Sequence, residues 1–174
     1  DALFAALGRL GTAQGTMNNL TFGNARYQYY ETICSGAPAG PGFDGAAAVH
    51  THMTNTRMTD PEVLEQRFPV VLDSFPSERG AGGKGRWNAG DGVTRTIRFR
   101  EDMECSILSE HRDVAPLGIN GGADGRTGRN WIKRADDSVQ ELSGCAQAQV
   151  QSGDAVVIQT PTGGGFGRVK DRER

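Results

Sequence analysis

Two histidines that stand two positions apart, His50 and His52, are the residues whose spacing most suggests chemistry. In an extended strand alternate side chains leave on the same face, so both imidazoles would point the same way. Two ring nitrogens on one wall can share a metal ion or a substrate, and Asp44 and Asn55 add oxygen and nitrogen groups nearby. The pattern also fits a pair of hydrogen-bonded structural histidines, because two ligands alone do not make a metal site.

The segment that carries these histidines is expected to run from a polar strand into a short helix. Residues 46–53 are predicted to form the strand. After it, Asp60-Pro61-Glu62 places a capping residue before a proline at the first helical position, with an acid in the first turn. The sequence therefore predicts a helix over residues 61–68.

Two upstream segments supply further polar groups. Residues 11–24 are small and polar, as in loops that a ligand can approach, and they contain Asn18 and Asn19. An ordinary series of turns is the alternative for this segment. Residues 26–34 alternate well enough for a strand, and place Glu31 among tyrosines and an isoleucine. An unpaired carboxylate would be costly there.

Glycine is the outlier in composition, with 25 of 174 residues, roughly twice its usual share. Residues 77–92 hold six glycines and three cations, including Arg86, and such a loop can bind an anion through backbone N–H groups and positive charge. It lacks the spacing and the Ser or Thr of a nucleotide-binding P-loop. A second glycine run, residues 160–167, is predicted to form a tight turn beside closely packed backbone.

Strand patterns dominate the second half of the chain, with turn residues every ten or so positions. The predicted strands after residue 67 are 68–75, VTRTIRFR, MECSILSE, RNWIKRA, VQELSGCAQAQV and AVVIQTP. Together with a predicted helix over residues 2–10, they indicate an α+β fold with short N-terminal helices and a β-rich, largely antiparallel C-terminal half, sandwich- or barrel-like. The chain is expected to be a single domain, 1–174, in which residues 1–76 bear the site and residues 77–174 form the scaffold.

Composition also argues against several partners. The net charge of −2 and the pI near 5.9 argue against nucleic-acid binding, and no apolar run approaches the roughly 18 residues that cross a bilayer. The three cysteines, Cys34, Cys105 and Cys145, are widely spaced with no C-x-x-C pair. Neither a disulfide framework nor a zinc knuckle is indicated, so a reducing, cytoplasmic setting is expected.

Residue spacing leaves four kinds of chemistry open. A hydrolase could place Cys34 or Ser35 beside His50, and a carboxylate pair such as Glu31 and Asp44 could do acid–base work. A metal site built on the two histidines would need a third ligand. The chain could equally be a non-catalytic β module that supports a partner.

Seven motifs narrow the choice when they are taken in order. The motifs are GTMNNLTFGN (15–24), YYET (29–32), DGAAAVHTHMTNT (44–56), DPEVLEQRFP (60–69), GGKGRWNAGDGV (82–93), APLGINGG (115–122) and GDAVVIQTPTGGGFG (153–167). Together they resemble the hydantoinase B/5-oxoprolinase family, and the match covers essentially all 174 residues. That family includes the B subunit of ATP-dependent hydantoinases, the C-terminal half of 5-oxoprolinase and the α subunit of acetone carboxylase.

The resemblance implies an ATP-dependent hydrolase that opens a cyclic amide such as hydantoin or 5-oxoproline. A hydantoinase A-type subunit or domain would use the ATP, so that no nucleotide binds to this chain. Family members are much longer, which identifies the chain as a C-terminal fragment that needs the rest of the B subunit and is inactive alone. The alternatives are a non-catalytic assembly module of that complex and part of a ketone carboxylase-like enzyme.

The matching motifs also supply pocket candidates. A divalent metal is expected at His50 and His52, with its remaining ligands outside this chain. The catalytic candidates are His50, His52, Asn55 and Glu31, and the candidates for binding the small cyclic-amide substrate are Asn18, Asn19, Asp44 and Arg86.

Overall fold

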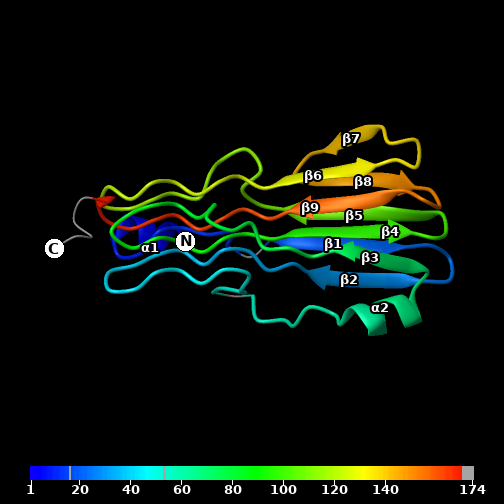
Figure 1. Cartoon of the computed structure of the whole chain (residues 1–174), viewed down its shortest axis with the longest axis horizontal. Helices are drawn as coiled ribbons and strands as arrows, with labels where there is room; N and C mark the ends of the chain where they lie inside the picture. The colour runs from blue at the N-terminus through cyan, green and yellow to red at the C-terminus, as the bar shows by residue number, and fades with distance from the viewer. Residues whose placement is uncertain (16, 53, 170–174) are drawn as a thin grey trace.

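A computed structural model describes residues 1–15, 17–52 and 54–169 of the chain, and its regular structure is mostly antiparallel β-sheet (Figure 1). One sheet has four strands in the order β2-β1-β5-β8, and the other has five in the order β3-β4-β9-β6-β7. The strands are β1 (Asn18–Gly23), β2 (Gln28–Thr32), β3 (Val70–Ser74), β4 (Thr94–Phe99), β5 (Met103–Ser109), β6 (Arg129–Lys133), β7 (Val139–Leu142), β8 (Cys145–Val150) and β9 (Ala155–Gln159). The helices are α1 (Ala2–Ala6) and α2 (Pro61–Arg67).

The two sheets pack face to face around one apolar core. Phe22 of β1 and Ile107 of β5 point inward from the first sheet, where they meet Ile97 and Phe99 of β4 and Val156 of β9. The strands alternate between buried and more exposed residues because only one face of each sheet lies against the core. The predicted α+β, β-rich class is confirmed, and the β part is a sandwich of two open sheets.

Most of the predicted strands are found, with three local corrections. Residues 11–24 were expected to be a loop, but β1 begins at Asn18 because its backbone pairs with both β2 and β5. Residues 139–150 form two strands, since the chain crosses from the five-stranded to the four-stranded sheet between Leu142 and Cys145. The first helix ends at Ala6 instead of continuing to residue 10, and Gly8 follows with a positive φ of 61°.

Helix α2 begins and ends almost as its sequence indicates. The Asp60 side chain accepts a hydrogen bond of 3.0 Å from the backbone N–H of Glu62, and Pro61 occupies the first turn, where a missing N–H costs nothing. Leu64 is fully buried and joins the core. No helix in the described part of the chain is long and apolar enough to cross a membrane.

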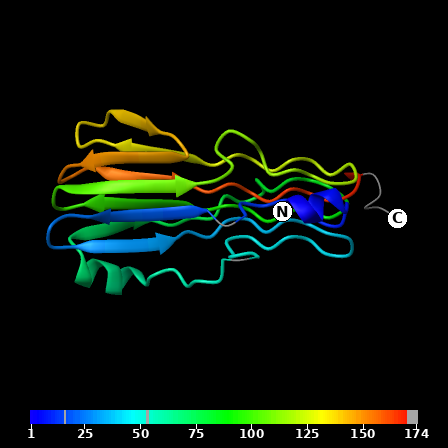
Figure 2. The same ribbon diagram turned by 180° about the vertical axis from the view of Figure 1, so that it is seen from behind.

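Beyond one end of the sandwich, glycine-rich extended segments run side by side (Figures 1 and 2). Residues 160–167 continue from β9 among these segments, and each successive residue hydrogen-bonds to different neighbours. The amides of Gly163, Gly164 and Gly165 donate to the carbonyls of Gly90, Thr12 and Ala123, at 3.1, 2.8 and 2.9 Å. Their carbonyls accept from Gly83, Ala39 and Ile119, each at 3.0 Å. A chain without internal hydrogen bonds is thereby held from several sides.

The glycines allow these backbones to approach closely. A Cβ on Gly163 would lie 2.2 Å from the Ala37 carbonyl oxygen, and one on Gly164 would lie 2.0 Å from the Leu117 carbonyl oxygen. Such contacts are far inside van der Waals distance, so any side chain there would push neighbouring segments apart. The predicted tight turn is therefore wrong, whereas the closely packed backbone predicted with it is present.

A buried ion pair links the two sheets through the core. Arg95 lies on the inward face of β4, and its Nε and Nη2 donate to Glu31 Oε1 and Oε2 of β2 at 2.6 and 3.0 Å. Both residues are at most 5% exposed. The Tyr29 hydroxyl lies 2.8 Å from Glu31 Oε2, and the Arg95 guanidinium stands 5.1 Å from the centre of the Phe75 ring. The carboxylate that would be costly alone is thus fully paired.

We expect Gly164→Ala to lower the free energy of unfolding by more than about 3 kcal/mol, because the new methyl group overlaps backbone that cannot rotate away. Gly80→Ala is the matched control, since Gly80 has a φ of 77° but open space around its Cβ position. It should lower the free energy of unfolding by only about 1–2 kcal/mol, because alanine is strained in the left-handed backbone conformation. Urea unfolding measures both changes, and equal losses would contradict the steric explanation.

Glu31→Gln is expected to lower the free energy of unfolding by about 3–5 kcal/mol, since it leaves the buried Arg95 charge without its counter-ion. Glu141→Gln is the control: Glu141 pairs with Arg129 on the surface, where both side chains are more than half exposed. That variant should unfold at nearly the wild-type denaturant concentration. If the two substitutions shifted the unfolding midpoint equally, the core ion pair would not hold the sheets together.

Candidate functional site

The segment with the two histidines is a loop and not the predicted strand. Within the described part of residues 46–53, the only ladder contact is an isolated bridge between Val49 and Ser35, with N–H to O distances of 2.9 and 3.2 Å. Ala48 and His52 have positive φ values of 54° and 56°. Left-handed residues interrupt the alternation of side chains, so strand geometry does not place both imidazoles on one face. The prediction that strand geometry points both imidazoles to the same side is therefore wrong, although both rings lie in this loop.

His52 packs against the N-terminal helix. Its ring stacks on the Phe4 ring with 5.5 Å between centroids, and its Nε2 lies 3.0 Å from Asp1 Oδ1. The side chain is 21% exposed. Burial lowers the pKa of His52, which favours the neutral imidazole.

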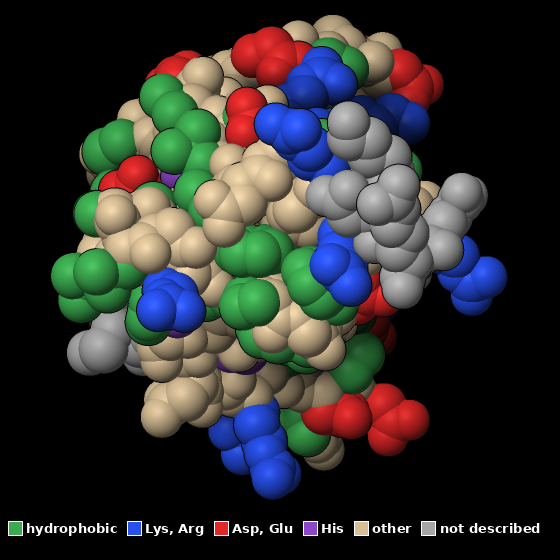
Figure 3. Space-filling view, turned by 90° about the vertical axis from the view of Figure 1, so that its left-hand side faces the viewer, with side chains coloured by type: hydrophobic (Ala, Val, Ile, Leu, Met, Phe, Trp, Pro, Cys, Tyr) green, Lys and Arg blue, Asp and Glu red, His purple; other side chains and the backbone are tan. Residues whose placement is uncertain are grey.

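His50 has no such neighbour for its polar atoms. Both ring nitrogens are buried, and neither has a hydrogen-bond partner among the described residues. Burial lowers the pKa of His50 as well, so its imidazole is neutral near pH 7. In Figure 3, which views the end formed by the extended segments, only small areas of histidine show between other side chains.

Glu31 lies apart from the surface, in the core ion pair described above. The Tyr29 hydroxyl beside it is also 2.7 Å from Thr59 Oγ1, so the pair is connected to the chain that follows the histidine loop. Burial, before any charge effect, raises the pKa of Tyr29, which keeps the phenol protonated. The contacts of Glu31 are those of a structural carboxylate that orients its neighbours.

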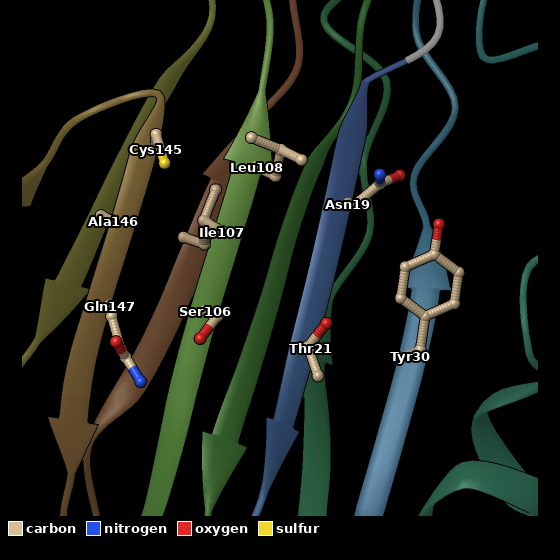
Figure 4. A pocket seen from close by; sticks show the side chains of 9 residues that line it. All are labelled: Asn19, Thr21, Tyr30, Ser106, Ile107, Leu108, Cys145, Ala146 and Gln147. Carbon is tan, nitrogen blue, oxygen red and sulfur yellow. The ribbon is translucent and has the colours of Figure 1, made fainter.

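Asn18 and Asn19 leave β1 on opposite faces. Asn18 points into the sandwich, where its Nδ2 donates to Gln14 Oε1. Asn19 points outward, and its Oδ1 accepts a 2.9 Å hydrogen bond from Thr32. It lines a shallow groove of about 400 Å³ on the outer face of the four-stranded sheet, together with Tyr30 (Figure 4). The structure therefore separates these two candidates.

The remaining candidates lie on the exposed loops. Asp44 Oδ1 accepts from the backbone N–H of Asn88 at 2.6 Å, and Arg86 of that same segment stacks 4.7 Å from the centre of the Trp87 ring. Asp44 and Arg86 are thus brought to one glycine-rich segment. Asn55 is exposed, and follows the histidine loop.

Sequence reasoning missed Arg95 and Gln14. Arg95 could have been found, because it occupies an inward position in the alternating strand 94–99 and so needs a buried anion. The polar segment of Gln14 carries no comparable pattern, yet its side chain is fully buried.

The donor set does not fit a metal ion by itself. Among the described residues, no group of three or more His, Cys, Asp or Glu side chains is arranged to hold one. Burial also raises the pKa of the Cys34 thiol and raises that of Cys105 to about 12, so both remain protonated. A thiolate nucleophile at Cys34 is therefore disfavoured.

Comparisons with known proteins identify relatives by sequence and structures that share the fold. 5-Oxoprolinase 1 of Arabidopsis thaliana is 46% identical over 167 residues, which cover 96% of this chain and 13% of that protein. Two solved structures share the fold: an ATP-dependent caprolactamase from Pseudomonas jessenii has a TM-score of 0.71 at 19% identity, over 91% of this chain and 30% of that one. A nucleotide-free acetone carboxylase has a TM-score of 0.70 at 16% identity, over 94% and 27%.

The chain thus spans about one seventh of the length of the curated relatives it matches. The family model described as hydantoinase B/oxoprolinase matches residues 1–169, which is nearly the whole sequence. On this evidence the chain belongs to the hydantoinase B/oxoprolinase family.

Proposed function

We propose that this chain forms part of an ATP-dependent cyclic-amide hydrolase, which opens a ring such as hydantoin or 5-oxoproline. The observation that carries the proposal is the 46% identity to a 5-oxoprolinase across almost all of this chain. His50 supports it, because a neutral imidazole with no hydrogen-bond partner among the described residues can accept or donate a proton near neutral pH.

The proposed division of labour assigns ATP to a partner. A hydantoinase A-type subunit or domain would phosphorylate the amide carbonyl oxygen, and this chain, with the rest of the B subunit, would help to open the ring. Arg86, whose side chain is exposed, is the proposed contact for an anionic group. The backbone amides expected to help it are already engaged, since those of Gly83, Arg86 and Trp87 donate to carbonyls of residues 163–167. Because the chain is about 13% of its relatives in length, we expect it to be inactive alone.

Within the site, His50 is the proposed proton-transfer residue, and His52, Asn55 and Asn18 are proposed to shape the pocket. Glu31 is assigned an orienting role through Tyr29 and the chain around Thr59. A divalent metal at the two histidines would take its other ligands from outside the described residues. A reducing, cytoplasmic setting is supported by three cysteines that are all free thiols.

A second candidate function is an assembly module that binds the A-type partner through its exposed loops. The exposed apolar side chains at Leu3, Leu7, Phe43 and Leu117 favour it, because such groups are commonly covered by partners.

Substitution of the histidines in the complete complex separates the two functions. If the site is catalytic, His50→Ala should reduce kcat for ATP-dependent ring opening by about 10²-fold or more while assembly is unchanged. His111→Ala is the control, since that third histidine bonds the Val114 carbonyl in a different loop. Turnover against a panel of cyclic amides and gel filtration with the A-type subunit give the two readouts. Unchanged turnover in His50→Ala would refute the catalytic assignment, and loss of assembly would favour the module.

A further inference from the structure

A set of buried polar side chains lies where the sandwich meets the histidine loop, and its members are joined by a closed series of contacts. Asn18 bonds Gln14 through its side chain, and its carbonyl accepts from the Ile33 amide at 2.8 Å. Two residues further on, Ser35 bridges Val49, which precedes His50.

The series closes through the other histidine. His52 lies against Asp1, and a Cβ on Gly15 would stand 3.3 Å from Asp1 Oδ2, beside Gln14. These contacts link six residues near the start of β1, which we call the polar junction: Asp1, Gln14, Asn18, Ser35, His50 and Thr51.

Buried polar atoms without a hydrogen-bond partner gather at this junction. Among the described residues they are Asp1 Oδ1, Gln14 Nε2, Asn18 Oδ1, Ser35 Oγ, both ring nitrogens of His50, Thr51 Oγ1 and Glu78 Oε2. Two of these atoms have an ion partner all the same: Asp1 Oδ1 lies 3.0 Å from His52 Nε2, and Glu78, which is not part of the junction, is paired with Arg126. Gln14, Asn18 and Ser35 are each at least 99% buried.

Several polar side chains that are buried elsewhere in the described part of the chain have hydrogen-bond partners. Thr160 Oγ1 accepts from the Val93 amide at 3.0 Å, and Asp154 accepts from Arg134 and Gln151. Native proteins leave few buried polar atoms unpaired, and each such atom costs about 1–3 kcal/mol. A concentration of them at one place therefore calls for a polar partner at that place.

We propose that the polar junction is a binding site for ordered water, and that this water is the hydrogen-bond partner of the His50 imidazole. The ligand must be small, because these atoms are sealed from the surface. The atoms offer both donors and acceptors. The Asn18–Gln14 hydrogen bond uses one N–H and one carbonyl oxygen, and leaves the NH2 group of one amide and the carbonyl oxygen of the other without a partner, whichever way both amides are turned. Buried waters typically make about three hydrogen bonds to such groups.

The bound water would fix the ring orientation of His50, which has no hydrogen-bond partner for its ring nitrogens among the described residues. Any catalytic consequence rests on the proposed function, because this imidazole is the group proposed to transfer a proton. The hydration itself does not depend on any activity, so the two can fail separately.

Magnetic relaxation dispersion of water on the 174-residue chain counts long-lived bound molecules. We expect Ser35→Ala to lose about one of them relative to wild type. Ser106→Ala is the matched control, because Ser106 lies on the outer face of the four-stranded sheet and lines the groove in Figure 4. It should leave the dispersion amplitude unchanged. Equal amplitudes in wild type and Ser35→Ala would overturn the proposal.

If Ser35→Ala does not fold, a high-resolution crystal structure of the wild-type chain tests the proposal instead. It should show a water oxygen within about 3.2 Å of at least two of Gln14 Nε2, Asn18 Oδ1, Ser35 Oγ and a His50 ring nitrogen. Direct pairing among these side chains, or a metal ion in the water's place, would overturn the assignment.

Discussion

The rest of the structure depends on backbone packing against backbone around Gly163 and Gly164. These residues lie in an extended segment whose amides and carbonyls are satisfied by several different neighbours, at distances near 3 Å. Side chains are excluded because a Cβ would lie as close as 2.0 Å to a neighbouring carbonyl. Ordering long glycine-rich segments costs a large conformational entropy, and the hydrogen bonds between these segments keep them ordered in spite of it. The twofold excess of glycine in the sequence is thus a packing requirement and not a sign of flexibility.

This packing positions the histidine loop between two anchors. On one side, Gly45 and Gly90 bring the chain before the histidines against the extended segments, and Val49 bridges Ser35. On the other side, Thr59 meets Tyr29, whose hydroxyl also contacts the buried Glu31–Arg95 pair. The positive φ values at Ala48 and His52 persist because both ends are held, as strained backbone requires. The sandwich therefore acts as the rigid base from which a strained polar loop is presented.

Local signals in the sequence were enough for elements whose cause is local. Asp60-Pro61-Glu62 predicts α2 because capping involves neighbours along the chain, and the alternation in residues 94–99 predicts β4. The histidine strand failed because alanine and histidine adopt left-handed backbone there, which propensity does not indicate. Asn18 and Asn19 were read as loop residues, yet pairing with two neighbouring strands overrides their weak strand preference. Glu31 and Arg95 are 64 positions apart in the sequence, so their ion pair can be predicted only when the alignment of the strands in both sheets is known.

The electrostatics of the junction limit what this part of the site can contribute. Glu31 and Arg95 neutralise each other in the core, and burial holds both histidines in the neutral form. The described groups there offer hydrogen bonds more than charge, so under the proposed function they would not by themselves stabilise a phosphorylated intermediate. The positive charge that such an intermediate needs must then come from the extended segments, where Arg86 lies, or from the remainder of the longer protein. Under the proposed function, the proton-transfer residue His50 and the positive charge that stabilises the activated substrate would accordingly be separated in space, and the packed extended segments would set the distance between them.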